Sequence, residues 1–174
     1  MIEIESNSTE ETMALAAAIA TALRPSDTVT LTGDLGAGKT CFVRGLAHGL
    51  GLDAADVSSP TFVIVHEYRR RLSQPRHETA ISIAADTVLI HLDAYRLSGP
   101  DDLHTIGWSE LIANPNAVMA IEWPQRIAAA LPPDRLDVTL SHLSPHRRSL
   151  ILTPVGAMQH RAWELAFSDY VEGQ

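Results

Sequence analysis

Residues 33–40 read Gly-Asp-Leu-Gly-Ala-Gly-Lys-Thr, which matches the phosphate-binding pattern G-x-x-x-x-G-K-[ST]. The backbone N–H groups of such a glycine-rich turn can close around an anion, because no Cβ atom blocks the approach. A helix that starts where the loop ends adds the positive end of its dipole. The pattern assigns Lys39 to the outer phosphates of a nucleotide and the hydroxyl of Thr40 to Mg²⁺. These residues predict a site for a nucleoside triphosphate with magnesium.

Two carboxylates at the ends of apolar runs are candidates for the metal and for catalysis. Asp93 ends the run 87–93, and Glu122 ends the run 117–122. A nucleotide-hydrolysing protein with this loop needs an acid near the Mg²⁺. Either carboxylate could hold the metal or orient the attacking water, and the sequence leaves the two roles open. His91 shares a strand face with Asp93, and we favour a hydrogen-bonded core histidine over a metal ligand there.

Several weaker candidates accompany this centre. Residues 59–61 could form a switch segment with a hydroxyl that senses the γ-phosphate, or only a turn before a strand. Trp123 could stack on a base or a partner, or lie in the core. Three arginines are possible stabilisers of phosphate charge, although a surface or ion-pair role is the simpler interpretation: Arg44, Arg96 and Arg126.

The segments that flank the loop predict the elements that must position it. Residues 28–32 favour a β-strand and residues 41–50 a helix, which is the strand–loop–helix setting that the pattern requires. Upstream, residues 8–11 have the form of a capping box, and an apolar face at helical spacing follows: Met13, Ala16, Ala17, Ala20 and Leu23. The alternation of Ile2 and Ile4 with acids predicts a short edge strand.

Downstream, strands and helices alternate. The predicted strands are 62–68, 87–93 and 117–122, followed by a hairpin over 136–152. The predicted helical stretches are 99–113, 124–131 and 156–170, and residues 69–79 form a basic, exposed connection. Strands mixed with helices around such a loop predict a three-layer α/β fold. We expect one domain over residues 1–174.

Composition narrows the class of protein. The chain has 174 residues, 45% of them hydrophobic, a formal net charge of −8 and one cysteine. No apolar run approaches the roughly 18 residues of a membrane span, the acidic start lacks a signal-peptide pattern, and we expect a cytoplasmic protein that binds neither membrane nor DNA. An acidic chain is a poor independent binder of nucleic acid, so any contact with RNA should run through a partner.

The single lysine, Lys39, excludes one class of protein and leaves others open. A GTPase needs the guanine-reading motif Asn-Lys-x-Asp, which would require a second lysine, so ATP is favoured. A small-molecule kinase remains possible, with residues 69–79 as a lid. A nucleotide-gated interaction subunit with slow hydrolysis is the third class, and the motifs alone do not separate the last two.

Four stretches in this order and spacing closely resemble the bacterial TsaE (YjeE) family: GDLGAGKT at 33–40, SSPTF at 58–62, HLDAYRL at 91–97 and IEWP at 121–124. That family is the ATPase component of the system that makes threonylcarbamoyladenosine in tRNAs reading codons that begin with A. The resemblance implies a P-loop NTPase-like sandwich with a mixed central sheet, with ATP and Mg²⁺ as cofactors. It also implies a TsaB–TsaD heterodimer as partner, which ATP hydrolysis resets between turnovers.

The resemblance also implies roles for individual residues. Lys39, Asp93 and Glu122 would form the catalytic centre, with Thr40, Asp93 and Glu122 around the metal. Thr61 would belong to the switch-like loop, and Thr9 and His146 would flank the adenine. The remaining nucleotide contacts would come from the loop itself: Asp34, Leu35, Gly36, Ala37, Gly38, Lys39, Thr40 and Cys41.

This sequence departs from the family pattern at two places. Cys41 stands where the family often has a second threonine, which does not affect Thr40 as the metal ligand. Residues 69–86 are longer than the usual connection and basic at their start, so partner docking at that edge could differ.

Overall fold

The computed structural model describes residues 1–59, 64–70 and 86–166. The predictions for Thr61, for the start of the 62–68 strand and for most of the basic connection lie outside these residues. In chain order the elements, with 3₁₀ helices labelled η, are β1 (Ile2–Ser6), α1 (Thr9–Ala20), β2 (Thr28–Thr32), α2 (Lys39–Gly49), η1 (Ala54–Asp56), β3 (Val65–Arg69), β4 (Val88–Asp93), η2 (Pro100–Ile106), α3 (Trp108–Ile112), β5 (Ala117–Glu122), η3 (Pro124–Ala130), β6 (Arg135–His142), β7 (Arg148–Val155), η4 (Gly156–His160) and η5 (Trp163–Ala166).

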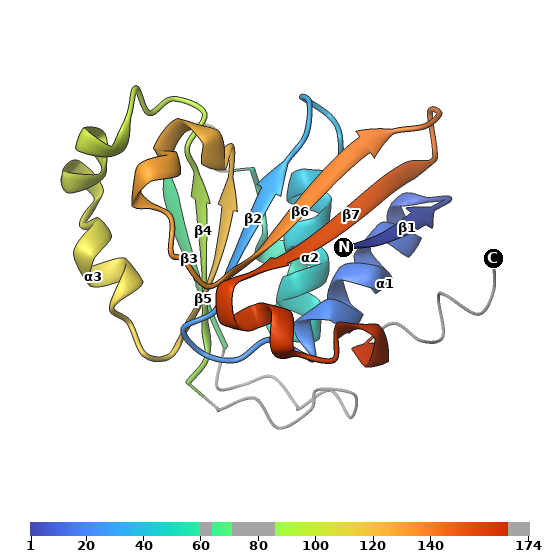
Figure 1. The fold of residues 1–174 in the computed structure, drawn as a ribbon, viewed down its shortest axis with the longest axis horizontal. Helices are drawn as coiled ribbons and strands as arrows, with labels where there is room; N and C mark the ends of the chain where they lie inside the picture. The colour runs from blue at the N-terminus through green and yellow to red at the C-terminus, as the bar shows by residue number, and fades with distance from the viewer. Residues whose placement is uncertain (60–63, 71–85, 167–174) are drawn as a thin grey trace.

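The described strands form one mixed sheet of seven strands in the order β1-β7-β6-β2-β5-β4-β3 (Figure 1). The four central strands β6, β2, β5 and β4 run parallel. The outer strands β3, β7 and β1 are antiparallel to their neighbours. The predicted edge strand at Ile2 and the predicted hairpin are therefore both confirmed, and so is the mixed sheet.

Alternating residues of the central strands divide the core between the two faces of the sheet. Leu89 and Ala120 belong to the core cluster that contains α1 and α2. Their neighbours Ile90 and Ile121 belong to a second cluster with η2, α3 and η3. Figure 1 shows α3, with η2 and η3 near it, on the other side of the sheet from α1 and α2. The arrangement confirms the predicted three-layer α/β fold.

The first helix begins as its sequence predicts and packs closely on α2. The hydroxyl of Ser8, the N-cap, accepts a hydrogen bond from the Glu11 N–H at 3.0 Å. Ala16 and Ala20 of the predicted apolar face are fully buried. They lie against two glycines of α2: a Cβ atom on Gly45 would meet the Ala16 Cβ at 2.6 Å, and one on Gly49 would meet the Ala20 Cβ at 2.7 Å. Small residues on both helices thus allow their backbones to approach.

The prediction of a terminal helix over 156–170 is wrong for residues 156–166, the part that the structure describes. Gly156 has a positive φ of 61°, and two short 3₁₀ turns, η4 and η5, follow it. Arg161 between them is extended and pairs with Asp27, while Trp163 is buried at 2% exposure and donates its indole N–H to the Met158 carbonyl. These tertiary contacts hold the chain against the base of α1 and interrupt the helix.

Two other predicted helices take a different form. The stretch 99–113 is divided into η2 and α3 by Gly107, which has a φ of 69°. The stretch 124–131 is the 3₁₀ helix η3, with a kink at Ile127. The described part of the 62–68 strand is confirmed as β3, which begins at Val65 and ends one residue later than predicted.

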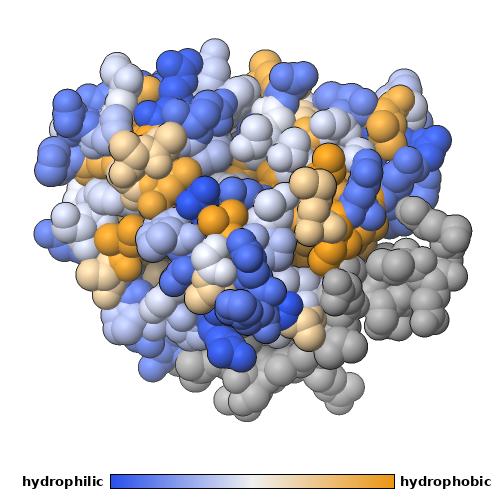
Figure 2. All heavy atoms as spheres, in the orientation of Figure 1, coloured by the Kyte–Doolittle hydropathy of each residue, from blue (hydrophilic) through white to orange (hydrophobic). Residues whose placement is uncertain are grey.

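The distribution of hydrophobic residues bears on whether the protein contacts a membrane. Figure 2 shows hydrophobic side chains on the visible face in several groups separated by hydrophilic ones. Among the described residues, no helix is long and apolar enough to cross a membrane. The cytoplasmic location expected from the sequence stays a prediction.

The contact between α1 and α2 predicts that Gly45→Ala destabilises the fold. A Cβ atom there would lie 2.3 Å from the Met13 carbonyl oxygen, so the backbones must separate. We expect the free energy of unfolding to fall by about 1–3 kcal/mol, the usual cost of overpacking, although alanine is the better helix former. Urea unfolding measures this change. Gly99→Ala is the control, since nothing lies within 4 Å of a Cβ atom there; equal stabilities of the two variants would contradict the packing account.

Candidate active site

Three parallel strands bring the predicted residues to one edge of the sheet. Asp93 and Glu122 are the last residues of β4 and β5 and are directly paired in the parallel register. Leu31, near the end of β2, pairs with Glu122 on the other side. The loop 33–40 leaves β2 at this same edge and leads into α2, whose first residue is Lys39. The predicted loop and both predicted carboxylates are therefore neighbours.

The loop backbone depends on three glycines with positive φ, Gly33, Gly36 and Gly38, at 154°, 79° and 107°. Gly33 also allows a close approach, because a Cβ atom there would lie 2.4 Å from the Leu140 carbonyl oxygen. Gly38 is the N-cap of α2 and has no side chain to cap it, so it leaves the N–H groups of the first turn open to an anion. The loop thus has the geometry of an anion cradle.

Lys39 is folded back onto its own loop. Its Nζ donates to the carbonyl oxygens of Gly33 at 2.8 Å and Asp34 at 2.9 Å, and it lies 4.0 Å from the ring centroid of Trp123. The residue is 4% exposed. Burial lowers the pKa of Lys39, and the negative charges of Glu122, Asp93 and Asp34 oppose that shift. A cation held near the loop in this way can turn to a bound phosphate over a short distance.

Glu122 joins the loop to the sheet through one carboxylate oxygen. The Thr40 hydroxyl donates to Glu122 Oε1 at 2.9 Å, and His91 Nε2 lies 2.9 Å from the same oxygen. His91 is fully buried, as expected for a hydrogen-bonded core histidine. The second carboxylate, Asp93, accepts a hydrogen bond from the Tyr95 N–H at 2.9 Å. Burial raises the pKa of Asp93, and the nearby charge of Glu122 raises it further.

The donor atoms at this edge suit magnesium better than a softer metal. Thr40, Asp93 and Glu122 offer a hydroxyl and two carboxylates, and Mg²⁺ prefers such oxygen ligands. Among the described residues, no group of three histidine, cysteine or acidic side chains is placed to hold a metal alone. Magnesium in nucleotide sites is commonly bound by one or two side chains together with substrate phosphates and water. The residues present therefore fit a magnesium–nucleotide complex.

Comparisons with known proteins establish the family of this chain. A family model described as "Threonylcarbamoyl adenosine biosynthesis protein TsaE" matches residues 6–150. The chain belongs to the TsaE family. It is 35% identical over 147 residues to the TsaE protein of Bacillus subtilis, covering 84% of this chain and 82% of the relative. It is 34% identical over 145 residues to that of Treponema pallidum, covering 83% and 95%.

A solved structure extends the likeness to the fold. The crystal structure of Bacillus subtilis YdiB matches with a TM-score of 0.65 and 28% sequence identity, covering 98% of this chain and 94% of that one. The P-loop NTPase-like fold class predicted from the sequence is in agreement with this neighbour. The family is one of tRNA threonylcarbamoyladenosine biosynthesis, which confirms the resemblance drawn from the four motifs.

The structure also places the residues that this TsaE-family resemblance put beside the adenine. Thr9 is exposed at the start of α1, and its carbonyl oxygen lies 3.5 Å from Cys41 Sγ, so these two residues flank the loop together. His146 is exposed in the turn between β6 and β7. Thr61 lies outside the described residues. The contacts of Thr9, Cys41 and His146 with a nucleotide stay predictions.

Two hairpin residues that the sequence did not single out lie beside the loop. Arg148 Nε donates to the Ala37 carbonyl oxygen at 3.2 Å. His142 Nε2 would lie 4.0 Å from a Cβ atom on Gly36. These two residues are directly paired across β6 and β7. The predicted hairpin could have indicated the pairing, but its placement over the loop comes from the tertiary fold.

The three candidate arginines do not meet at the loop. Arg44 Nε donates to the Val57 carbonyl oxygen at 3.0 Å, and the Arg126 guanidinium lies 5.8 Å from the ring centroid of Tyr95. Arg96 is exposed. Trp123 is the aromatic residue that does face the loop, through Lys39. It also packs against Tyr95, with ring centroids 5.1 Å apart.

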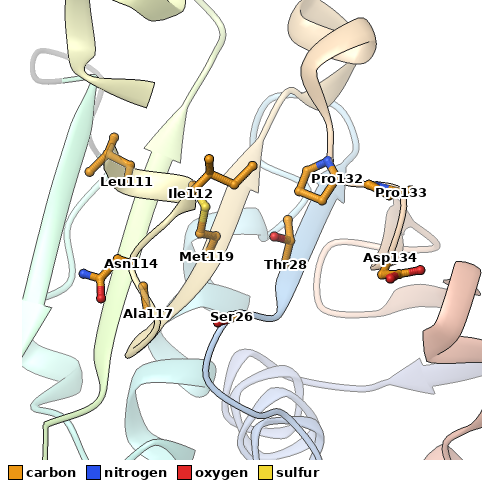
Figure 3. Close-up of a pocket in the computed structure, with 10 residues that line it drawn as sticks. All are labelled: Ser26, Thr28, Leu111, Ile112, Asn114, Ala117, Met119, Pro132, Pro133 and Asp134. Carbon is orange, nitrogen blue, oxygen red and sulfur yellow. The ribbon is translucent and has the colours of Figure 1, made fainter. Parts of the chain in front are cut away.

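A separate pocket lies at the opposite edge of the sheet, where β2 and β5 begin. Its volume is about 250 Å³, and it is lined by Thr28, Met119 and residues around Leu111 and Pro132 (Figure 3). Because the chain runs from this edge along β2 to the loop, the pocket is not part of the site at residues 33–40.

The raised pKa of Asp93 predicts a pH-dependent gain in stability from Asp93→Asn. A folded-state pKa above the ordinary value means that folding favours the protonated acid. The free energy of unfolding therefore falls as the pH rises from the pKa of the unfolded chain through the pKa of the folded protein. Asparagine removes the charge and can still accept from the Tyr95 N–H. We expect a higher melting temperature at pH 7 and a smaller gain near pH 4, where aspartate is about half protonated in the unfolded chain.

Thermal unfolding at the two pH values measures this difference. Asp101→Asn, at an exposed acid in the first turn of η2, is the control and should change little. A melting temperature that Asp93→Asn lowers equally at both pH values would contradict the assignment of a destabilised buried charge.

Proposed function

We propose that this protein is a Mg²⁺-dependent ATPase subunit for threonylcarbamoyladenosine modification at position 37 of tRNAs that read codons beginning with A. It would bind a TsaB–TsaD-like heterodimer and reset that transferase complex between turnovers. The observation that carries the proposal is the contact of the Thr40 hydroxyl with Glu122, beside Lys39 in a loop built for an anion. Membership of the TsaE family supplies the tRNA modification.

Each side chain of the site has a definite task in this proposal. Lys39 exchanges its two carbonyl acceptors for oxygens of the outer phosphates, as its position in the loop allows. Thr40 and Glu122 would hold Mg²⁺, together with Asp93. When bound, the metal neutralises charge that develops on the phosphates. Asp93 is paired with Glu122 at the end of β4, where a carboxylate can also orient the attacking water.

The partners follow from charge and from family. The formal net charge of −8 makes direct tRNA binding unfavourable, so tRNA is reached through the TsaB–TsaD-like heterodimer. The exposed loop residues Asp34, Leu35 and Gly36 lie where a partner could cover the nucleotide. Leu35 is 89% exposed. A partner that excludes water from this edge would strengthen the electrostatic contacts there, which is why we expect weak activity alone and stimulation by partners.

The proposal predicts that Lys39→Ala and Glu122→Ala each abolish repeated turnover in reconstituted tRNA modification. The expected loss is at least about 100-fold, because removal of one stabilising group from a charged transition state costs on the order of 10²–10³ in rate. Arg24→Ala, at an exposed position before β2, is the control. Both the modified nucleoside and the released phosphate are measured.

The outcomes separate the proposal from its alternatives. Continued multiple turnover in both variants would contradict the proposed role. Transfer of γ-labelled phosphate from ATP to a nucleoside or sugar would instead identify a small-molecule kinase. Full tRNA modification without phosphate release would indicate a scaffold that does not hydrolyse ATP.

A further inference from the structure

We infer that His91 is a positioning residue, which orients Glu122 so that the Thr40 hydroxyl presents its lone pairs to the metal. This inference rests on the proposed function of the same site. It concerns a side chain that would touch neither nucleotide nor metal. Its basis is the shared oxygen of Glu122, which lies 2.9 Å from Thr40 Oγ1 and 2.9 Å from His91 Nε2.

The surroundings of the imidazole decide which nitrogen carries its hydrogen. Within the part of the chain that the structure describes, His91 Nδ1 is buried and has no hydrogen-bond partner. A neutral imidazole has one N–H and one acceptor nitrogen. A hydrogen on Nδ1 would be buried unpaired and would direct the Nε2 lone pair at a carboxylate oxygen. The hydrogen therefore lies on Nε2, and His91 donates to Glu122.

The strand register makes this diagonal contact possible. His91 is paired with Ala120 across β4 and β5, while Glu122 is two residues further along β5 and points to the same face. Ala120 is fully buried and has only a methyl group, so the imidazole can reach past it. His91 itself is held on its other side by Tyr68, with ring centroids 6.4 Å apart. Packing on both sides fixes the direction in which His91 donates.

The consequence for Thr40 follows from its single hydrogen. A threonine hydroxyl has one O–H and two lone pairs. When the O–H points to Glu122 Oε1, the lone pairs face away from the carboxylate and toward the loop. Without the His91 donor, Oε1 loses one of its two close partners and the carboxylate can rotate. The hydroxyl would then lose its fixed direction, and magnesium would bind less tightly.

Three substitutions at one position test this inference. His91→Gln places an amide N–H at about the reach of Nε2, His91→Asn places it only at the reach of Nδ1, and His91→Leu removes it. ATP affinity is measured as a function of Mg²⁺ concentration, with the affinity in EDTA as the metal-free reference. The Mg²⁺ midpoint is the concentration at which half of the gain in ATP affinity is reached. Thermal unfolding establishes that each variant folds.

The expected pattern distinguishes orientation from space filling. Loss of a hydrogen-bond partner behind a metal ligand commonly costs 10–100-fold in metal affinity. We expect His91→Asn and His91→Leu to raise the Mg²⁺ midpoint by about tenfold or more, His91→Gln to stay within about threefold of the natural protein, and ATP affinity in EDTA to be unchanged. Should His91→Leu fail to fold, the asparagine and glutamine variants still give the comparison.

A second readout does not depend on nucleotide. Nitrogen-15 NMR of the free protein reports which imidazole nitrogen carries hydrogen, and we expect Nε2. A hydrogen on Nδ1, an unchanged Mg²⁺ midpoint in His91→Asn, or equal losses in His91→Asn and His91→Gln would overturn the inference. Failure of the natural protein to bind ATP more tightly with Mg²⁺ would overturn the proposed function as well, so the two failures are distinguishable.

Discussion

The buried carboxylate of Glu122 is the group on which the rest of the site depends. It is 3% exposed, and one of its oxygens lies 2.9 Å from both the Thr40 hydroxyl and His91 Nε2. A buried charge is unfavourable unless such polar groups surround it. Because Thr40 belongs to α2, His91 to β4 and Glu122 to β5, a single oxygen atom connects the helix to two strands. The position of the loop relative to the sheet is thereby fixed where phosphate and metal would bind.

The site gathers charge that the rest of the fold must offset. Burial lowers the pKa of Lys39 and raises that of Asp93, so both charged forms are held at some expense in stability. The two core clusters and the close contact of α1 with α2 at Gly45 supply that stability away from the site. The same contact brings Thr9 beside Cys41 at the edge of the loop.

The local sequence pattern was sufficient to predict the strand, loop and helix around residues 33–40. It also predicted that Asp93 lies near Glu122, because parallel strands end at one edge of a sheet. The contact of Trp123 with Lys39 was not predictable, since it depends on a left-handed backbone at Trp123, with a φ of 59°. Arg148 reaches the loop only through the way the hairpin packs over it. The prediction of a terminal helix was wrong because the burial of Trp163 in the core outweighs the helix propensity of the segment. Local rules thus predicted the elements, whereas contacts between distant elements required the structure.

The coupling of Thr40 to Glu122 is the most direct test of this account. Calorimetric titration of ATP with Mg²⁺ would compare the natural protein with Thr40→Val, Glu122→Gln and the double variant. If the two side chains act as one metal-binding unit, each single change weakens Mg²⁺-dependent binding and the double change is little worse than either, with a coupling energy of about 1 kcal/mol or more. Strictly additive losses, or Mg²⁺-dependent binding that is as tight in the double variant as in the natural protein, would contradict the account.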